Sequence, residues 1–112
     1  MSHTIYKYPF TIQDSFTKLL PVNSKVLRVA PQNGIPTMWV LHSSNTDVIS
    51  ARTFRIFGTG HFIENISSLV YIGTFDLNYG TWHVFEEVDT GKTFIENLLK
   101  ESAQTYSEPD HA

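Results

Sequence analysis

The chain has 112 residues, a formal net charge of −3 and no cysteine. The lack of cysteine excludes disulfides, thiol catalysis and thiolate metal sites, and it suits a reducing cytoplasm. The acidic balance disfavours generic nucleic-acid binding through a basic surface. We expect no membrane association, since no apolar run approaches the ~20 residues of a span and no signal-peptide pattern opens the chain.

Short β-type runs separated by turn residues predict an all-β core of about seven strands, arranged as an antiparallel sandwich or a partly open barrel. The runs lie at 4–8, 15–20, 25–30, 36–41, 52–57, 69–77 and 81–87. Proline stops the first two runs, at Pro9 and Pro21. Together they predict one β domain over residues 1–88.

The dipeptide Asn33-Gly34 is the strongest hairpin signal in the chain. As the two central residues of a type I′ turn, it fixes which residues lie opposite each other in the flanking strands. The predicted opposed pairs are Leu27 with Val40, Val29 with Met38, and Arg28 with Trp39. The first two pairs form one apolar face, and the third pair lies on the other face.

Arg28 over Trp39 predicts a cation–π pair, worth ~0.5–2 kcal/mol depending on solvation. The pair is also a flat platform on which a base or another planar group can stack. In the alternative interpretation, a surface arginine simply covers an otherwise wet tryptophan.

A second hairpin is predicted around residues 78–80, with Asn78-Tyr79-Gly80 as a three-residue loop. A two-residue turn at Tyr79-Gly80 is the alternative, and it would change which side chains face inward.

The hydrophobic period changes after residue 87. Residues 93–102 place apolar side chains at i, i+4 and predict a short amphipathic helix within the segment 89–103. Such a helix is unstable alone, so we expect it to pack on the β domain or on a partner subunit. Residues 104–112 are predicted to be a disordered tail.

The stretch 52–61, RTFRIFGTGH, carries the strongest functional signal. Strand alternation puts Arg52 on one face with Phe54 and Ile56, and Arg55 on the other with Thr53 and Phe57. The glycine-rich turn that follows can present backbone N–H groups to an anion, with the arginines supplying charge. The predicted ligand-binding residues are Arg28, Trp39, Arg52, Arg55, Gly58, Thr59, Gly60, His61 and Phe62.

Two structural alternatives to this site stay open. The glycines of the turn can serve its geometry alone. One arginine can be solvated while the other pairs with an acidic neighbour such as Glu64 or Asp76.

Neither a metal site nor a cofactor is predicted, because the histidines His3, His42, His61, His83 and His111 lack ligand spacing. No nucleophile elbow, P-loop or dinucleotide fingerprint is present, so we predict no catalytic residues. Thr59 beside His61 is the strongest hydroxyl candidate, and His61 or His83 would be the base of a hydrolase.

The segments IYKYPF, KVLRV, RTFRIFGTGHFIE, YIGTF and HVFEE together resemble a family of small phage-encoded domains of unknown function, over about residues 4–87. Members of that family usually have proline after GTGH, where this chain has Phe62. The resemblance implies a protein that acts in the host cytoplasm during phage infection, and we expect it to form a homo-oligomer.

With the arginine and aromatic content, this context predicts a phage counter-defence protein. It would bind and sequester a small phosphorylated, nucleotide-type immune signal without turnover. One alternative is a protein-interaction module that inhibits a host defence enzyme through residues 93–102, Phe62 and Tyr79. The others are a nucleotide hydrolase that uses His61 or His83, and a structural component of the virion.

Overall fold

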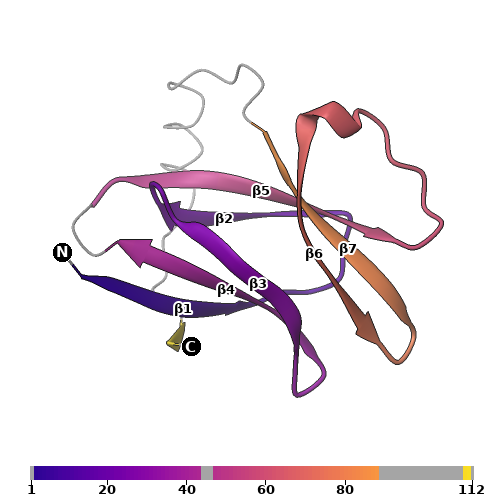
Figure 1. The fold of residues 1–112 in the computed structure, drawn as a ribbon, viewed down its shortest axis with the longest axis horizontal. Helices are drawn as coiled ribbons and strands as arrows, with labels where there is room; N and C mark the ends of the chain where they lie inside the picture. The colour runs from indigo at the N-terminus through magenta and orange to yellow at the C-terminus, as the bar shows by residue number, and fades with distance from the viewer. Residues whose placement is uncertain (1, 44–46, 89–109, 112) are drawn as a thin grey trace.

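The computed structural model describes residues 2–43, 47–88 and 110–111, which form two four-stranded antiparallel sheets (Figure 1). The first sheet has the strand order β3-β4-β1-β8 and the second has the order β2-β5-β7-β6. The strands are β1 (His3–Pro9), β2 (Ser15–Pro21), β3 (Lys25–Gln32), β4 (Ile35–Ser43), β5 (Ile49–Gly58), β6 (Leu69–Leu77), β7 (Gly80–Glu87) and the two-residue β8 (Asp110–His111). The seven predicted strands are confirmed, since each predicted run lies within one of β1 to β7.

The core lies between the two sheets and takes side chains from both. Its buried members are Tyr8, Val29, Met38 and Val40 from the first sheet, Leu20, Phe54, Ile56, Phe75 and Val84 from the second, and Phe10 from the segment after β1. Phe54, Met38 and Val84 are fully buried, and burial of side chains of this size stabilises a fold by roughly 1.5–3 kcal/mol each. Alternation along β5 therefore directs Arg52 toward the core side of its sheet and Arg55 toward the outer side.

The first hairpin turns as predicted but contains a bulge. Asn33 and Gly34 have φ of 52° and 78°, the positive values that a type I′ turn needs. The predicted pairs Arg28–Trp39 and Val29–Met38 are confirmed. The predicted pair Leu27–Val40 is wrong, because Val26 pairs with Val40 and Leu27 is the extra residue of a β-bulge. The bulge lets Val26 and Val29, three residues apart, both face the core, while Leu27 stays 45% exposed.

The second hairpin has a shorter connection than the predicted three-residue loop. Leu77 pairs with Gly80, so only Asn78 and Tyr79 lie between the strands, and neither the three-residue loop nor a turn at Tyr79-Gly80 is correct. Gly80 is the first residue of β7 and has a φ of 153°, which side-chain-bearing residues rarely adopt. A glycine that looks like a loop residue in the sequence therefore belongs to the strand.

The edge strands β3 and β6 pack against each other where the two sheets meet. A second bulge between Tyr71 and Gly73 shapes β6 at this point. A Cβ atom on Gly73 would lie 2.7 Å from Cγ2 of Val29, a stiff, buried side chain of the core. Glycine is thus required at position 73 because there is no room for a side chain, and not because of its backbone conformation.

His42 is a core residue of β4, only 4% exposed. Its Nε2 lies 2.9 Å from the Tyr8 hydroxyl, and the Tyr6 ring centre is 4.6 Å from the imidazole centre. Burial lowers the pKa of His42 below its ordinary 6.5, because the charged form loses its solvation. His83 lies on the outer side of the second sheet, since its neighbour Val84 faces the core.

The C-terminal predictions fall mostly on residues that the structure does not describe. The helix over 93–102, in the segment 89–103, lies outside the described residues. Of the predicted tail 104–112, only Asp110 and His111 are described, as β8 paired with Tyr6 and Lys7. Within the described ranges, no helix has the length and apolar character needed to cross a bilayer.

Replacing Gly73 by alanine should destabilise the protein by about 1–3 kcal/mol, since the new methyl group overlaps Val29. In a Val29→Ala background the same change should cost much less, because the overlapping methyl is gone. Urea unfolding of the two single variants and the double variant measures this coupling. An equal cost of Gly73→Ala in both backgrounds would contradict the steric explanation.

We expect His42 to make stability depend on pH. Its folded-state pKa is lower than its unfolded value of 6.5, so the unfolded chain binds the proton more tightly. The contribution of neutral His42 to the free energy of unfolding is complete above pH 6.5 and is lost as the pH falls below that value. The stability difference between wild type and His42→Gln, measured by urea unfolding, should therefore shrink from pH 7.5 to pH 5. A difference that stays constant over this range would refute the assignment.

Candidate functional site

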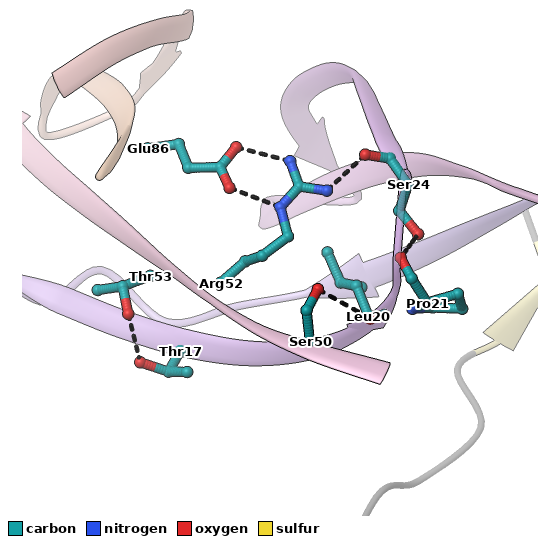
Figure 2. A network of polar contacts seen from close by, with 8 residues as sticks. All are labelled: Thr17, Leu20, Pro21, Ser24, Ser50, Arg52, Thr53 and Glu86. Carbon is teal, nitrogen blue, oxygen red and sulfur yellow. Dashed lines mark hydrogen bonds and ion pairs between the residues drawn. The ribbon is translucent and has the colours of Figure 1, made fainter. Parts of the chain in front are cut away.

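Arg52 is held at the margin of the core by three hydrogen bonds to two residues, Glu86 and Ser24 (Figure 2). Its Nε lies 2.5 Å from Glu86 Oε2 and its Nη2 lies 2.7 Å from Glu86 Oε1, a two-pronged ion pair between β5 and β7. Its Nη1 donates to the carbonyl oxygen of Ser24, in the turn between β2 and β3. The side chains of Arg52 and Glu86 are 21% and 18% exposed. This guanidinium therefore ties two strands to a turn, and its donors are largely committed within the chain.

Glu86 reaches Arg52 because of the pairing of β5 with β7. Phe54 lies opposite Glu86 in that pairing, so Arg52 is the diagonal neighbour on the same face. The alternative of an ion pair with an acidic neighbour thus describes Arg52, although the partner is Glu86 and neither Glu64 nor Asp76.

Arg55 lies on the outer face of the same sheet in a looser setting. Its Nη1 is 3.7 Å from Glu87 Oε2, too far for a hydrogen bond, and its Nε is 3.4 Å from the carbonyl oxygen of Asp14. The guanidinium carbon lies 5.3 Å from the ring centre of Phe57. With a side chain that is 36% exposed, Arg55 keeps donors for a further partner.

An open pocket of about 540 Å³ adjoins Arg55. Strands β5 and β7 supply one group of lining residues, Arg55, Phe57 and Glu87, and the segment between β5 and β6 supplies the other, Phe62, Glu64, Asn65 and Ser68. Phe62 is 85% exposed, so its ring is available to a ligand. The volume lies within the range that small-molecule sites occupy.

The Gly-Thr-Gly-His turn uses its amides within the chain. The Gly58 N–H donates to His61 Nδ1 at 3.1 Å, the Thr59 N–H to the Thr81 carbonyl at 3.2 Å, and the His61 N–H to the Gly58 carbonyl at 3.0 Å. Gly60 has a φ of 91°, a value that glycine adopts without strain. These contacts fit the alternative in which the glycines serve the geometry of the turn, rather than a cradle of amides for an anion.

Gly58 also makes room for two rings. A Cβ atom at this position would lie 3.0 Å from the imidazole of His61 and 3.0 Å from the indole of Trp82. The two ring centres are 6.4 Å apart in an edge-on arrangement. His61 therefore packs over the turn and against Trp82 of β7, and it is not among the residues that line the pocket.

His83 joins a chain of hydroxyl groups on the outer face of the second sheet. Its Nε2 lies 2.8 Å from Thr59 Oγ1 and its Nδ1 lies 2.9 Å from Thr74 Oγ1. The Tyr71 hydroxyl is 2.5 Å from Thr74 Oγ1. The sequence places Thr59 beside His61, but the fold pairs it with His83, because Gly58 lies opposite Trp82 in the pairing of β5 with β7.

The predicted cation–π pair is confirmed, with the Arg28 guanidinium 5.6 Å from the Trp39 ring centre. Both residues lie on the outer face of the first sheet, since their neighbours Val29 and Met38 face the core. The predicted site residues thus separate into distinct places. Arg28 and Trp39 lie on one sheet, Arg52 lies at the margin of the core, and Arg55 and Phe62 lie at the pocket.

Several pocket residues were not among the predicted ligand-binding residues. They are Phe57, Glu64, Asn65, Ser68 and Glu87. Strand alternation already places Phe57 on the face of Arg55, and it places Glu87 on the face of His83. No periodic signal covers residues 63–68, where the chain is mostly irregular around the single 3₁₀ turn Ile66–Ser68.

Residues 1–94 match the sequence model of a family described as a domain of unknown function, DUF7352. All of β1 to β7 lies within the matched range. Neither a curated protein nor a solved structure matches the chain.

The two arginines of β5 should differ in their effect on stability. Replacing Arg52 by alanine removes three hydrogen bonds and leaves the partly buried Glu86 unpaired, so we expect a loss of about 2 kcal/mol or more. Arg55→Ala removes only a long, exposed ion pair and should change stability by less than about 1 kcal/mol. Urea unfolding of both variants tests this, and equal losses would disprove the distinction.

Proposed function

The chain belongs to the DUF7352 family, whose function is unknown, and from its geometry we propose a non-catalytic binding module for a small phosphorylated, nucleotide-type ligand. The ligand would occupy the pocket beside Arg55. The observation that carries the proposal is a partly exposed guanidinium, held over Phe57, in a cavity that the exposed ring of Phe62 also lines.

The chemistry of these groups suits a nucleotide. A guanidinium presents planar donors that match phosphate oxygens, and stacking of a base on an aromatic ring is worth ~1–3 kcal/mol. Glu64 and Glu87 place two carboxylates in the pocket against the one guanidinium of Arg55. This balance favours a ligand with one phosphate near Arg55 over a polyphosphate.

The biological role is a further part of the proposal. The resemblance of residues 4–87 to phage-encoded domains supports sequestration of a nucleotide-type immune signal in the host cytoplasm during infection. We include a homo-oligomer in this proposal. The binding residues are revised to Arg55, Phe57 and Phe62, since Arg52 is committed to Glu86 and Arg28 lies on the other sheet.

A hydrolase is the second candidate, and one observation favours it. Thr59 Oγ1 lies 2.8 Å from His83 Nε2, while Thr74 holds the other ring nitrogen, an arrangement in which an imidazole can take a hydroxyl proton. His83 is a better candidate for this base than His61, whose Nδ1 accepts the Gly58 N–H.

A protein-interaction module is the third candidate. Phe62 and Tyr79 are 85% and 71% exposed, and aromatic side chains of this kind anchor protein interfaces. In this case a host protein would cover one or both rings.

Binding should depend on Arg55 and not on Arg28. We expect Arg55→Ala to weaken nucleotide binding about 10-fold or more, because a charge-assisted hydrogen bond to phosphate is lost. Arg28→Ala is the matched control, since it removes an arginine stacked on an aromatic ring of the other sheet. Native mass spectrometry and calorimetry of the full chain with mononucleotides and cyclic dinucleotides measure both effects.

The same incubations distinguish the three candidates. Recovery of intact nucleotide from the complex supports sequestration. A converted nucleotide whose formation stops in His83→Ala supports the hydrolase. If no nucleotide binds or reacts, the pocket proposal fails and a protein partner becomes the leading candidate.

A further inference from the structure

The irregular segment between β5 and β6 brings two polar side chains with unused hydrogen-bonding capacity to the pocket. Glu64 lies in the same lining as Phe62. Within residues 2–43 and 47–88, the acidic partners of the ion pairs are Glu86 and Glu87, and Glu64 has no such pair. The neighbouring Asn65 adopts a left-handed φ of 55°, and its side chain makes no capping hydrogen bond to the 3₁₀ turn that follows.

Such a pair of groups distinguishes among nucleobases. A carboxylate is an acceptor only, whereas an amide side chain both donates and accepts. Guanine presents two adjacent donors, N1–H and the exocyclic N2 amine, next to the O6 acceptor. Adenine presents one amine donor beside the acceptor N1, which a carboxylate repels, and hypoxanthine lacks the N2 amine.

We propose that the pocket selects guanine, an inference that rests on the proposed nucleotide-binding function. Glu64 accepts hydrogen bonds from N1–H and the N2 amine, and the Asn65 amide donates to O6. The Phe62 ring stacks on the base. The phosphate then meets Arg55 on the strand side of the pocket. An anionic Glu64 is therefore a specificity group, and its charge is a reason for the pocket to accept only one phosphate.

The test compares GMP, IMP and AMP, titrated into the full chain by calorimetry. We expect GMP to bind about 5- to 150-fold more tightly than AMP, the discrimination typical of a bidentate base contact. The affinity for IMP should lie between those for GMP and AMP, since hypoxanthine keeps N1–H but lacks the N2 amine. Glu64→Gln should reduce the GMP preference. Asp47→Asn, which neutralises an exposed carboxylate outside the pocket lining, should preserve it.

Each result has a distinct meaning. Arg55-dependent binding of all three nucleotides with equal affinity would overturn the guanine inference and leave the proposed function standing. A preference for AMP, or a GMP preference that survives Glu64→Gln, would also overturn it. No binding of any of the three nucleotides would overturn this inference, and failure across the cyclic dinucleotides as well would remove the proposed function. Thermal melts of each variant check that the exposed side chains of Glu64 and Asp47 can be changed without unfolding.

Discussion

The alternation of side chains along β5 is the constraint on which both the core and the pocket depend. It directs Phe54 and Ile56 into the core, so two arginines three positions apart fall on opposite sides of one sheet. On the inner side, desolvation makes an unpaired guanidinium costly, and Arg52 is accordingly enclosed by Glu86 and Ser24. On the outer side, water stabilises the charge of Arg55, which can therefore remain loosely paired beside an open pocket.

Close packing explains two glycines, and one of them, Gly58, is among the predicted ligand-binding residues. Gly58 leaves room for the rings of His61 and Trp82, and Gly73 leaves room for Val29. The turn that begins at Gly58 supports the pocket indirectly, since it starts the segment that carries Phe62 and Glu64. The residues that shape the turn are thus separate from the residues that line the pocket, which lie on β5, on β7 and on the irregular segment.

Local signals predict much of this fold, and non-local contacts account for the rest. Proline stops, alternation and Asn33-Gly34 fix seven strands and one turn, because each acts over a few residues. The bulge at Leu27 instead lets Val26 pack against the core, and no short sequence pattern reveals this contact. Alternation separates Arg52 from Arg55, but their partners Glu86 and Glu87 follow from the adjacency of β5 and β7, strands that are not consecutive in the chain.

The hydroxyl chain through His83 has a direction. A neutral imidazole donates from one nitrogen and accepts at the other, so each of its two tautomers orders the neighbouring hydroxyl hydrogens in the opposite sense. In one tautomer Thr59 receives a hydrogen bond from the ring and keeps its own hydrogen for another acceptor. In the other, Thr59 gives that hydrogen to the ring, and Thr74 receives one from it. The role of the Thr59 hydroxyl as donor or acceptor is thereby coupled to that of the Tyr71 hydroxyl, across the width of two strands.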